Sequence, residues 1–139
     1  MKIIIPESQH THIKSSDEVD VWLPMEPQPP KWTIAVECIP GLTWRCVGKN
    51  LDSEIMPISD PPYLLNVEYA LDKETFLTPV KIAVRRLHGM STEEIELALG
   101  DTSYGLLRDF REQWNQDHPS YPWSINPWTF KMAMKVRNL

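Results

Sequence analysis

Hydrophobic and polar positions alternate most clearly near the end of the chain. Apolar side chains recur there at every second position: Trp128, Phe130, Met132, Met134 and Val136. Basic residues stand among the positions between them, so the pattern predicts a closing β-strand with one buried face. Asn126-Pro127 stands directly before the strand and predicts a rigid turn, because proline fixes its own φ and disfavours helical backbone in the preceding residue.

Shorter runs of β-branched and aromatic residues predict further strands earlier in the chain. They cover residues 3–5, 19–23, 32–39, 42–47, 63–71 and 80–87. Pro40-Gly41 separates the third and fourth of these runs and predicts a hairpin turn. In the last run the alternation places Val80, Ile82 and Val84 on one face. Residues 7–18 carry no such pattern and are expected to form a polar loop.

Two helices are predicted between the last two strands. Ser91-Thr92-Glu93-Glu94 is a capping box, in which a serine hydroxyl and a glutamate three residues later satisfy the first free amides of a helix. This helix is expected to end near Leu99, before Gly100. A second helix fits residues 105–116, where Leu106, Leu107, Phe110 and Trp114 form one apolar stripe.

This order of elements predicts an α+β fold, a small mixed β-barrel with two helices before the last strand. The chain has 139 residues, which is enough for a single domain over residues 1–139 with a core of its own. Its 13 prolines gather mostly in residues 24–30 and 57–62 and predict loops there. Its six tryptophans argue against a disordered chain, which lacks large aromatic surface.

The charge is unevenly distributed along the chain. The net charge of −5 argues against indiscriminate nucleic-acid binding, which needs a basic surface. Residues 1–78 hold six Lys and Arg against twelve Asp and Glu, whereas residues 79–139 hold eight against seven. Lys81, Arg85 and Arg86 are therefore a candidate basic patch for phosphates. The alternative is that they are ordinary solvated charges at a strand edge.

Trp123 is the tryptophan whose position best suits ligand contact, because it lies in a loop between Pro122 and Ser124. An exposed aromatic ring can stack on an unpaired base. The alternative is that the ring packs at the rim of the core. Trp114 and Trp128 belong to periodic elements and are expected in the core.

Few residues suggest catalysis, a metal or a cofactor. His10 and His12 lie two apart without a third ligand nearby, so we expect no metal site. No serine stands in a nucleophile-elbow context, and no glycine-rich phosphate loop is present. Cys38 and Cys46 form no CxxC pair and are expected to be reduced thiols in a cytoplasmic protein. No segment of the sequence fits a signal peptide or a membrane span.

Several segments together resemble the ASCH-domain proteins of phages and prophages. They are Val84-Arg85-Arg86-Leu87, Met90-Ser91-Thr92-Glu93-Glu94, Phe110-Arg111-Glu112-Gln113-Trp114, Tyr121-Pro122-Trp123 and Asn126-Pro127-Trp128. The corresponding family motifs are a "VxRLQxIS-E" strand-to-helix junction, an "F-x-LW" helix and an "NPWVW" last strand. The resemblance covers about residues 80–139. Earlier, residues 23–29 are similar to the proline-rich stretch after the family's "GxKTQTRR" loop, and residues 60–68 are similar to its "PGDxLxVxE" segment without the glycine.

The resemblance implies a PUA-like β-barrel whose cleft handles RNA, nucleotides or modified nucleosides. One branch of the family is an acetylcytidine amidohydrolase that uses a Lys, a Thr and a Glu. In the same register this chain has Glu18 at the lysine position and Val19 at the threonine position. Neither side chain can replace a nucleophile and its proton shuttle, so we expect the hydrolase site to be lost.

These observations predict a non-catalytic, ASCH-like phage or prophage protein in the cytoplasm of a bacterial host. It would bind RNA, single-stranded nucleic acid or a nucleotide without a cofactor, through Lys81, Arg85, Arg86 and Trp123. One alternative is an accessory factor whose acidic first 78 residues engage a host protein. The other alternative is an amidohydrolase that acts on a modified nucleoside.

Overall fold

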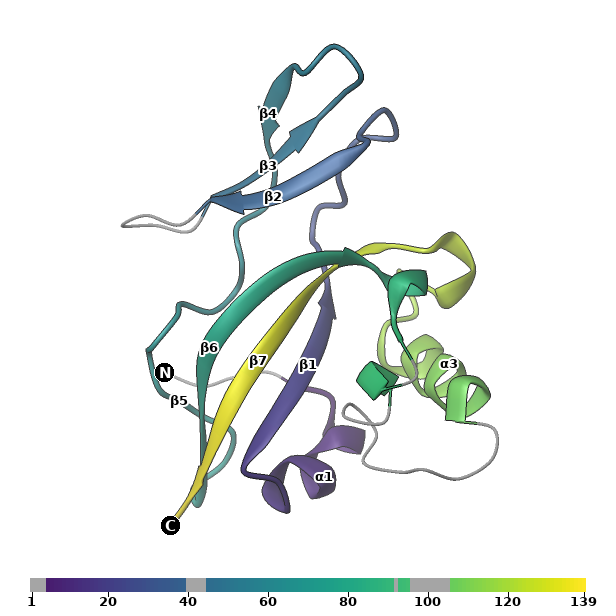
Figure 1. Cartoon of the computed structure of the whole chain (residues 1–139). Coiled ribbons are helices and arrows are strands. Elements are labelled where there is room, and N and C mark those ends of the chain that lie inside the picture. Colours follow the sequence, from purple (N-terminus) through teal and green to yellow (C-terminus); the bar gives the residue numbers. More distant parts are fainter. Residues whose placement is uncertain (1–4, 40–44, 92, 96–105) are drawn as a thin grey trace.

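The computed structural model describes residues 5–39, 45–91, 93–95 and 106–139. It contains two antiparallel sheets and a few short helices (Figure 1). The main sheet has the strand order β1 (Glu18–Pro24), β7 (Trp128–Asn138), β6 (Thr75–Arg86) and β5 (Tyr69–Ala70). The small sheet has the order β2 (Ala35–Ile39), β3 (Arg45–Lys49) and β4 (Ile55–Pro57).

The helical elements lie at the ends of the main sheet. Near the N-terminus, the short 3-10 helix η1 (Glu7–Gln9) leads into α1 (His10–Lys14). The turn η2 (Leu87–Gly89) follows β6, and residues 93–95 are helical. Helix α3 (Leu106–Asp117) and the turn η3 (Trp123–Ile125) precede β7.

Strand β7 is the centre of the main sheet, because β1 pairs along one of its edges and β6 along the other. The predicted closing strand is therefore confirmed, and it begins directly after Asn126-Pro127. Asn126 has a φ of 49°, a left-handed conformation that asparagine tolerates better than most residues. Its side-chain oxygen accepts the backbone N–H of His88 at 2.8 Å, which fixes the corner between β6 and β7.

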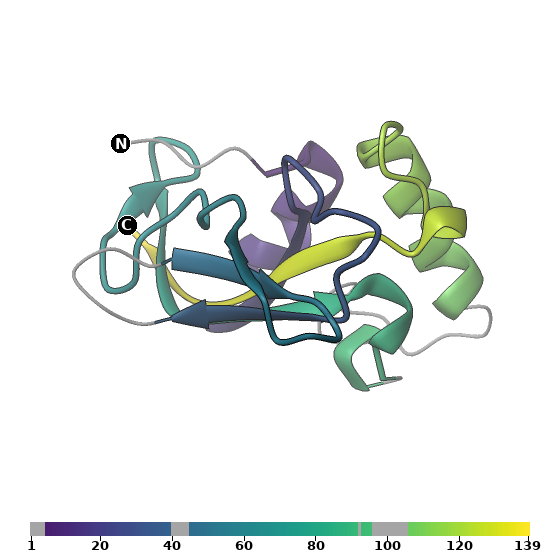
Figure 2. The same cartoon turned by 90° about the horizontal axis from the view of Figure 1, so that it is seen from above.

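The larger hydrophobic core lies between the two sheets. Val21, Leu77 and Met132 of the main sheet are fully buried in it, and Cys46 of the small sheet is 1% exposed. In Figure 1 and Figure 2 the small sheet lies across the curved β6–β7–β1 surface. The apolar residues that alternate along β7 therefore lie on the face of the main sheet that packs against the small sheet.

A second apolar cluster joins the helical part to the opposite face of the main sheet. Its buried members are Trp22, Leu87, Ile95, Phe110 and Trp114, with Met90 and Trp123 packed against them. Phe110 and Trp114 come from α3, which confirms the predicted second helix and its apolar stripe at these two positions. Leu107, predicted on the same stripe, is 48% exposed.

The capping box at the start of the first predicted helix is also confirmed. The backbone N–H of Ser91 donates to Oε1 of Glu94 at 3.0 Å, and the N–H of Glu94 donates to Oγ of Ser91 at 3.2 Å. The predicted end of this helix at residues 99–100 lies outside the described residues. The same holds for the turn at residues 40–41, although β2 and β3 do pair as the predicted hairpin.

The predicted strand over residues 63–71 is wrong, because only Tyr69–Ala70 is a strand. Asn66 has a φ of 61°, which interrupts extended backbone. The predicted loop over residues 7–18 is also wrong, since it contains η1 and α1 and buries Ile13 completely. Strand β4 was not predicted at all. Of the expected strand at residues 3–5, only Ile5 is described, and it is not in a strand.

Val80 does not share a face with Ile82 and Val84 as predicted. A bulge in β6 shifts the pairing with β7 between Pro79 and Lys81 and leaves Val80 37% exposed. Beyond the bulge, Ile82 lies opposite Met132 and faces the core.

Cys38 and Cys46 form a disulfide, so the expectation of reduced thiols is wrong for this structure. The two residues lie directly opposite each other on β2 and β3, with a Cα–Cα distance of 4.3 Å. A spacing of eight residues in sequence gave no sign of this pairing, because it depends on the register of the hairpin.

The α+β class is confirmed, with two antiparallel sheets in place of a single continuous one. Within the described residues, no strand pairing closes either sheet into a barrel. None of the described helices is long and apolar enough to cross a bilayer.

Candidate nucleic-acid interface

The face of the main sheet that points away from the larger core carries charged side chains on all three long strands. We call it the polar face. Alternation and strand register assign to it Glu18, Asp20 and Trp22 of β1; Thr129, Lys131, Ala133, Lys135 and Arg137 of β7; and Phe76, Thr78, Lys81, Ala83 and Arg85 of β6. The bulge at Val80 is what brings Lys81, Ala83 and Arg85 into line with the polar positions of β7.

A pocket of about 170 Å³ lies near the middle of the polar face. Its small side chains are Ala83 and Ala133 on neighbouring strands. Its charged side chains are Asp20, Lys81, Arg85 and Lys131. Short alanine side chains between long charged ones leave a depression with cations around it.

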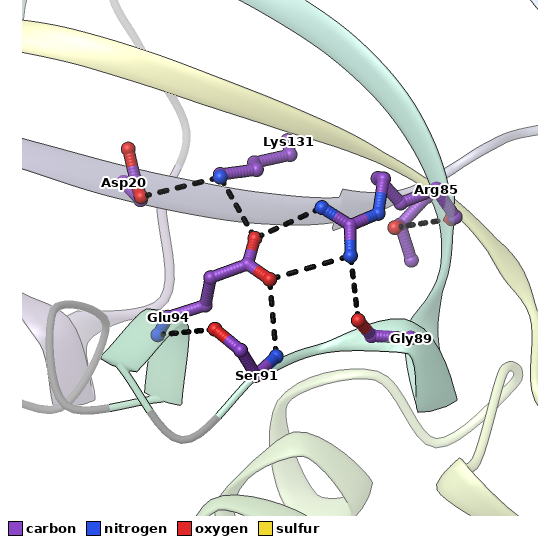
Figure 3. Close-up of polar contacts among 7 residues, drawn as sticks. Asp20, Arg85, Gly89, Ser91, Glu94 and Lys131 are labelled. Carbon is purple, nitrogen blue, oxygen red and sulfur yellow. Dashed lines mark hydrogen bonds and ion pairs between the residues drawn. The ribbon is translucent and has the colours of Figure 1, made fainter.

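Glu94 forms ion pairs with Arg85 and Lys131, two of the cations that line this pocket (Figure 3). The guanidinium of Arg85 donates from both terminal nitrogens to the two carboxylate oxygens, at 3.2 and 3.3 Å. The ammonium of Lys131 lies 2.7 Å from Oε2 of Glu94 and 3.8 Å from Oδ2 of Asp20. Arg85 also donates to the carbonyl of Gly89 at 2.5 Å, so its position is fixed on two sides.

The two carboxyl groups respond differently to these surroundings. Burial alone would raise the pKa of Glu94, but the Lys131 ammonium, the Ser91 amide and the Arg85 guanidinium together lower it. The pKa of Asp20 is raised, chiefly by burial. The attraction of Lys131 opposes that shift, and the negative charges of Glu94 and Glu18 add to it. The surroundings of Glu94 therefore favour its charged form, whereas those of Asp20 disfavour its charged form.

Trp22 forms the end of the polar face under this network. The charged groups of Arg85 and Lys131 each lie 5.9 Å from its ring centroid, within the range of a cation–π contact. The side chain is only 2% exposed, and its indole N–H has no hydrogen-bond partner in the structure. The Trp22 ring therefore contacts both cations inside the protein and is too buried to stack on a base.

The four residues predicted as contacts do not all come together. Lys81 and Arg85 line the same pocket. Arg86 points to the other side of β6, where it lies 4.6 Å over the ring of Trp128 and donates to the carbonyl of Asn126 at 2.9 Å. Two of the predicted contacts therefore belong to one site, and Arg86 belongs to the β6–β7 corner.

Trp123 packs in the second apolar cluster, away from the pocket lining. Its ring lies 4.5 Å from the ring of His88 and 6.1 Å from that of Phe110. Its backbone N–H donates to the side chain of Asn115 at 2.8 Å, and its carbonyl contacts Nε2 of His88 at 2.5 Å. Trp123 therefore packs at the rim of the second apolar cluster, which is the alternative given for it above.

Four residues in the pocket or near it were not predicted from the sequence: Asp20, Glu94, Lys131 and Lys135. Lys131 and Lys135 were visible as basic positions between the apolar residues of the last strand, which is the signal that could have found them. Asp20 gave no signal, because its proximity to Lys131 depends on strand pairing. The capping box already accounted for a glutamate at position 94, so its ion pairs were not predicted. A carboxylate nevertheless has enough lone pairs to cap a helix and bind two cations at once.

The hydroxyl groups near the network are committed to backbone contacts. Thr129 is fully buried and donates to the carbonyl of Arg85 at 2.7 Å. Ser91 accepts the helix-capping bond from Glu94. Among the described residues no cluster of three His, Cys, Asp or Glu is arranged to hold a metal ion. The arrangement can bind an anion, since its cations are fixed and partly exposed.

We expect Asp20→Asn to raise the free energy of unfolding at pH 7. The raised pKa of Asp20 means that the folded protein holds a proton more tightly than the unfolded chain does. Wild-type stability is therefore lost as the pH rises from the ordinary value of 3.8 through the folded-state pKa. The gain from Asn should appear above this window and vanish below it, as urea unfolding at several pH values can measure.

Asp72→Asn is the matched control, because its shift has the opposite sign. A hydrogen bond from Lys14, with further bonds from the amides of Glu74 and Thr75, lowers the pKa of Asp72 to about 2. Its contribution is present above the ordinary value of 3.8 and is lost as the pH falls toward about 2, so the Asn variant should be less stable at pH 7. Equal signs for the two variants at pH 7 would contradict this account of Asp20.

Comparison of the chain with protein-family models, curated proteins and solved structures found no match. The resemblance to ASCH-domain proteins therefore rests on the sequence motifs alone and stays a prediction.

Proposed function

We propose that this protein is a non-catalytic module that binds RNA, single-stranded nucleic acid or a nucleotide through phosphate contacts on the polar face. The observation that carries the proposal is the pocket between Ala83 and Ala133, with Lys81, Arg85 and Lys131 around it. Cations fixed around a depression suit a phosphate group. In a chain with a net charge of −5, a face on which basic side chains outnumber acidic ones is a local exception.

Lys81 and Lys135 are the side chains most available to a ligand. Both are exposed, and neither forms an ion pair with any residue that the structure describes. Glu94 partly neutralises Arg85 and Lys131. These two side chains would therefore orient a bound phosphate more than they would attract it. Because Trp22 is buried and Trp123 is packed against neighbouring rings, phosphate contacts would supply most of the affinity.

Binding is favoured over hydrolysis because the nearby hydroxyls are occupied. Thr129 and Ser91 both bond to the backbone, and Lys131 stands as a cation between two carboxylates. An activated nucleophile would need a base within hydrogen-bonding reach and an open path to substrate.

The proposal includes an ASCH-like lineage, with the two sheets as a divergent PUA-like barrel in a phage or prophage protein of the bacterial cytoplasm. The support for it is that the motifs of the resemblance fall on β6, η2, residues 93–95, α3 and the start of β7. These elements surround the end of the polar face where Glu94 binds Arg85.

Titration of a labelled single-stranded RNA at two salt concentrations tests the proposal. We expect binding with a Kd of about 1–100 μM at physiological salt, which becomes much tighter at low salt. In Lys81→Ala/Lys135→Ala, the slope of log K against log salt should fall by about 0.7 for each phosphate that the variant can no longer neutralise. Fluorescence anisotropy measures both quantities.

Lys31→Ala/Lys73→Ala provides the matched control, since both are exposed lysines outside the polar face. It changes the net charge without changing the face and should leave the slope unaltered. Absence of binding at low salt would reject the proposal and leave a host protein as the partner to pursue. An equal effect of Lys31→Ala/Lys73→Ala would show that only net charge matters.

A further inference from the structure

A second, larger pocket lies on the other side of the main sheet from the polar face. Its volume is about 350 Å³, which falls within the range of small-molecule sites. It forms where the end of β1, the segment after β4 and the C-terminal end of α3 meet. Leu23 and Phe130, which lie opposite each other in the sheet and face the larger core, contribute to its wall.

The wall of this pocket is apolar. Besides Leu23 and Phe130, it includes Tyr63, Pro24 and Pro62. Tyr63 is 7% exposed, and its ring is held edge-on against that of Tyr69 at 5.0 Å. Two aromatic rings and two prolines give a rigid wall that suits a flat or compact apolar group.

The charged side chains that line this pocket are both acidic. Glu26 and Asp60 both line it and are both exposed. Oδ1 of Asp60 accepts the backbone N–H of Cys46 at 3.3 Å, which fixes the carboxylate and leaves its second oxygen for a ligand. Of the lining residues that the structure describes, none is a lysine or an arginine. The electrostatic character is therefore opposite to that of the polar face.

His118 also lines this pocket, although its Nε2 is itself shielded from solvent. Its Nε2 is buried and has no hydrogen-bond partner in the structure, an arrangement that costs free energy unless something pairs with it. The ring is held 4.3 Å from that of Trp114, so the nitrogen cannot easily swing to solvent. Burial lowers the pKa of His118 despite the charges of Asp117 and Glu26, so the imidazole is neutral at pH 7.

We propose that this pocket binds a small organic cation, an amine or amidine carried on a flat apolar body. The apolar wall would take the body, and the carboxylates of Glu26 and Asp60 would pair with the positive group. An anionic ligand such as a nucleotide is disfavoured here, because it would face two carboxylates.

Benzamidine, benzamide and benzoate are the probes that test this proposal, since they share one flat ring and differ in charge. Protein NMR shifts should saturate with benzamidine in the millimolar range, with the largest changes at residues that line the pocket. Benzamide should bind several-fold more weakly, and benzoate at least tenfold more weakly. The double variant Glu26→Gln/Asp60→Asn should weaken benzamidine binding by about tenfold, as expected when two charge-assisted bonds are removed.

The matched control is Asp52→Asn/Glu112→Gln, which removes the same charge from two exposed sites outside the pocket. It should leave the benzamidine Kd unchanged. Equal binding of benzoate and benzamidine, shifts that map to the polar face, or no saturable shift at all would overturn the proposal. The result is independent of RNA binding, because Lys81→Ala/Lys135→Ala leaves this pocket intact.

Discussion

Replacement of Trp114 by alanine is expected to lower the free energy of unfolding by about 3–5 kcal/mol. The side chain is 3% exposed at the centre of the second apolar cluster. Its ring stacks on Phe110 with centroids 6.2 Å apart, and its indole N–H donates to the carbonyl of Tyr121 at 2.7 Å. Alanine would leave a cavity and an unpaired carbonyl together.

Urea unfolding followed by circular dichroism measures this loss without depending on tryptophan emission. Trp114→Phe keeps an aromatic ring and removes the N–H together with only part of the indole volume, so we expect a smaller loss of about 1–2 kcal/mol. Trp32→Ala serves as the control, since Trp32 is 39% exposed. If Trp114→Ala costs no more than Trp32→Ala, the packing of α3 against the sheet is not what stabilises this part of the fold.

The elements that the sequence predicted well are those with a long one-sided pattern. Strand β7 repeats apolar residues along its whole length and starts at a rigid Asn-Pro corner, and α3 buries two aromatic rings one turn apart. In such elements, burial and local backbone preference agree, so the pattern alone is informative.

The elements that the sequence did not predict are short. Strand β4 has only three residues and was not predicted, and β5 has two residues and was predicted as part of a much longer strand; the strand conformation of both comes from pairing with β3 and β6. Helix α1 has five residues and one buried side chain, Ile13, so no periodicity can be seen in it. These are cases in which tertiary contacts decide the local structure.

The candidate site was predicted in part, for a similar reason. Lys81 and Arg85 stand out on a β-rich run, but the bulge at Val80 that brings them beside Lys131 has no signal in the sequence. The neighbours Asp20, Glu94 and Lys131 come from three distant segments, so only the strand register and the helix position bring them together.

Glu94→Gln should have two opposite effects, a loss of stability and a gain in RNA binding. The variant keeps a side-chain oxygen that can accept from Ser91 and removes the charge that pairs with Arg85 and Lys131. Glu94 has a side chain only 12% exposed, whereas that of Arg85 is 39% exposed and partly screened by water, so we expect a loss of about 1–3 kcal/mol. Urea unfolding measures this loss.

The gain in binding follows from the same ion pairs. Without the Glu94 charge, Arg85 and Lys131 become free to pair with phosphate, so the salt slope should steepen by about 0.7 for each further phosphate that is neutralised, and the Kd at low salt should fall several-fold. Glu93→Gln is a closely matched control, because the adjacent exposed residue makes the same change in net charge. It should alter the Kd little.

The direction of this change distinguishes a binding face from a purely structural ion-pair network. If Glu94 only stabilises the fold, its removal loosens the end of the sheet and RNA binding falls or does not change. If the polar face binds phosphate, a less stable protein binds RNA more tightly, a combination that loss of structure cannot produce. Asp20→Asn should also free Lys131 without a loss of stability at pH 7, so tighter RNA binding by both variants would connect the gain to the released cations.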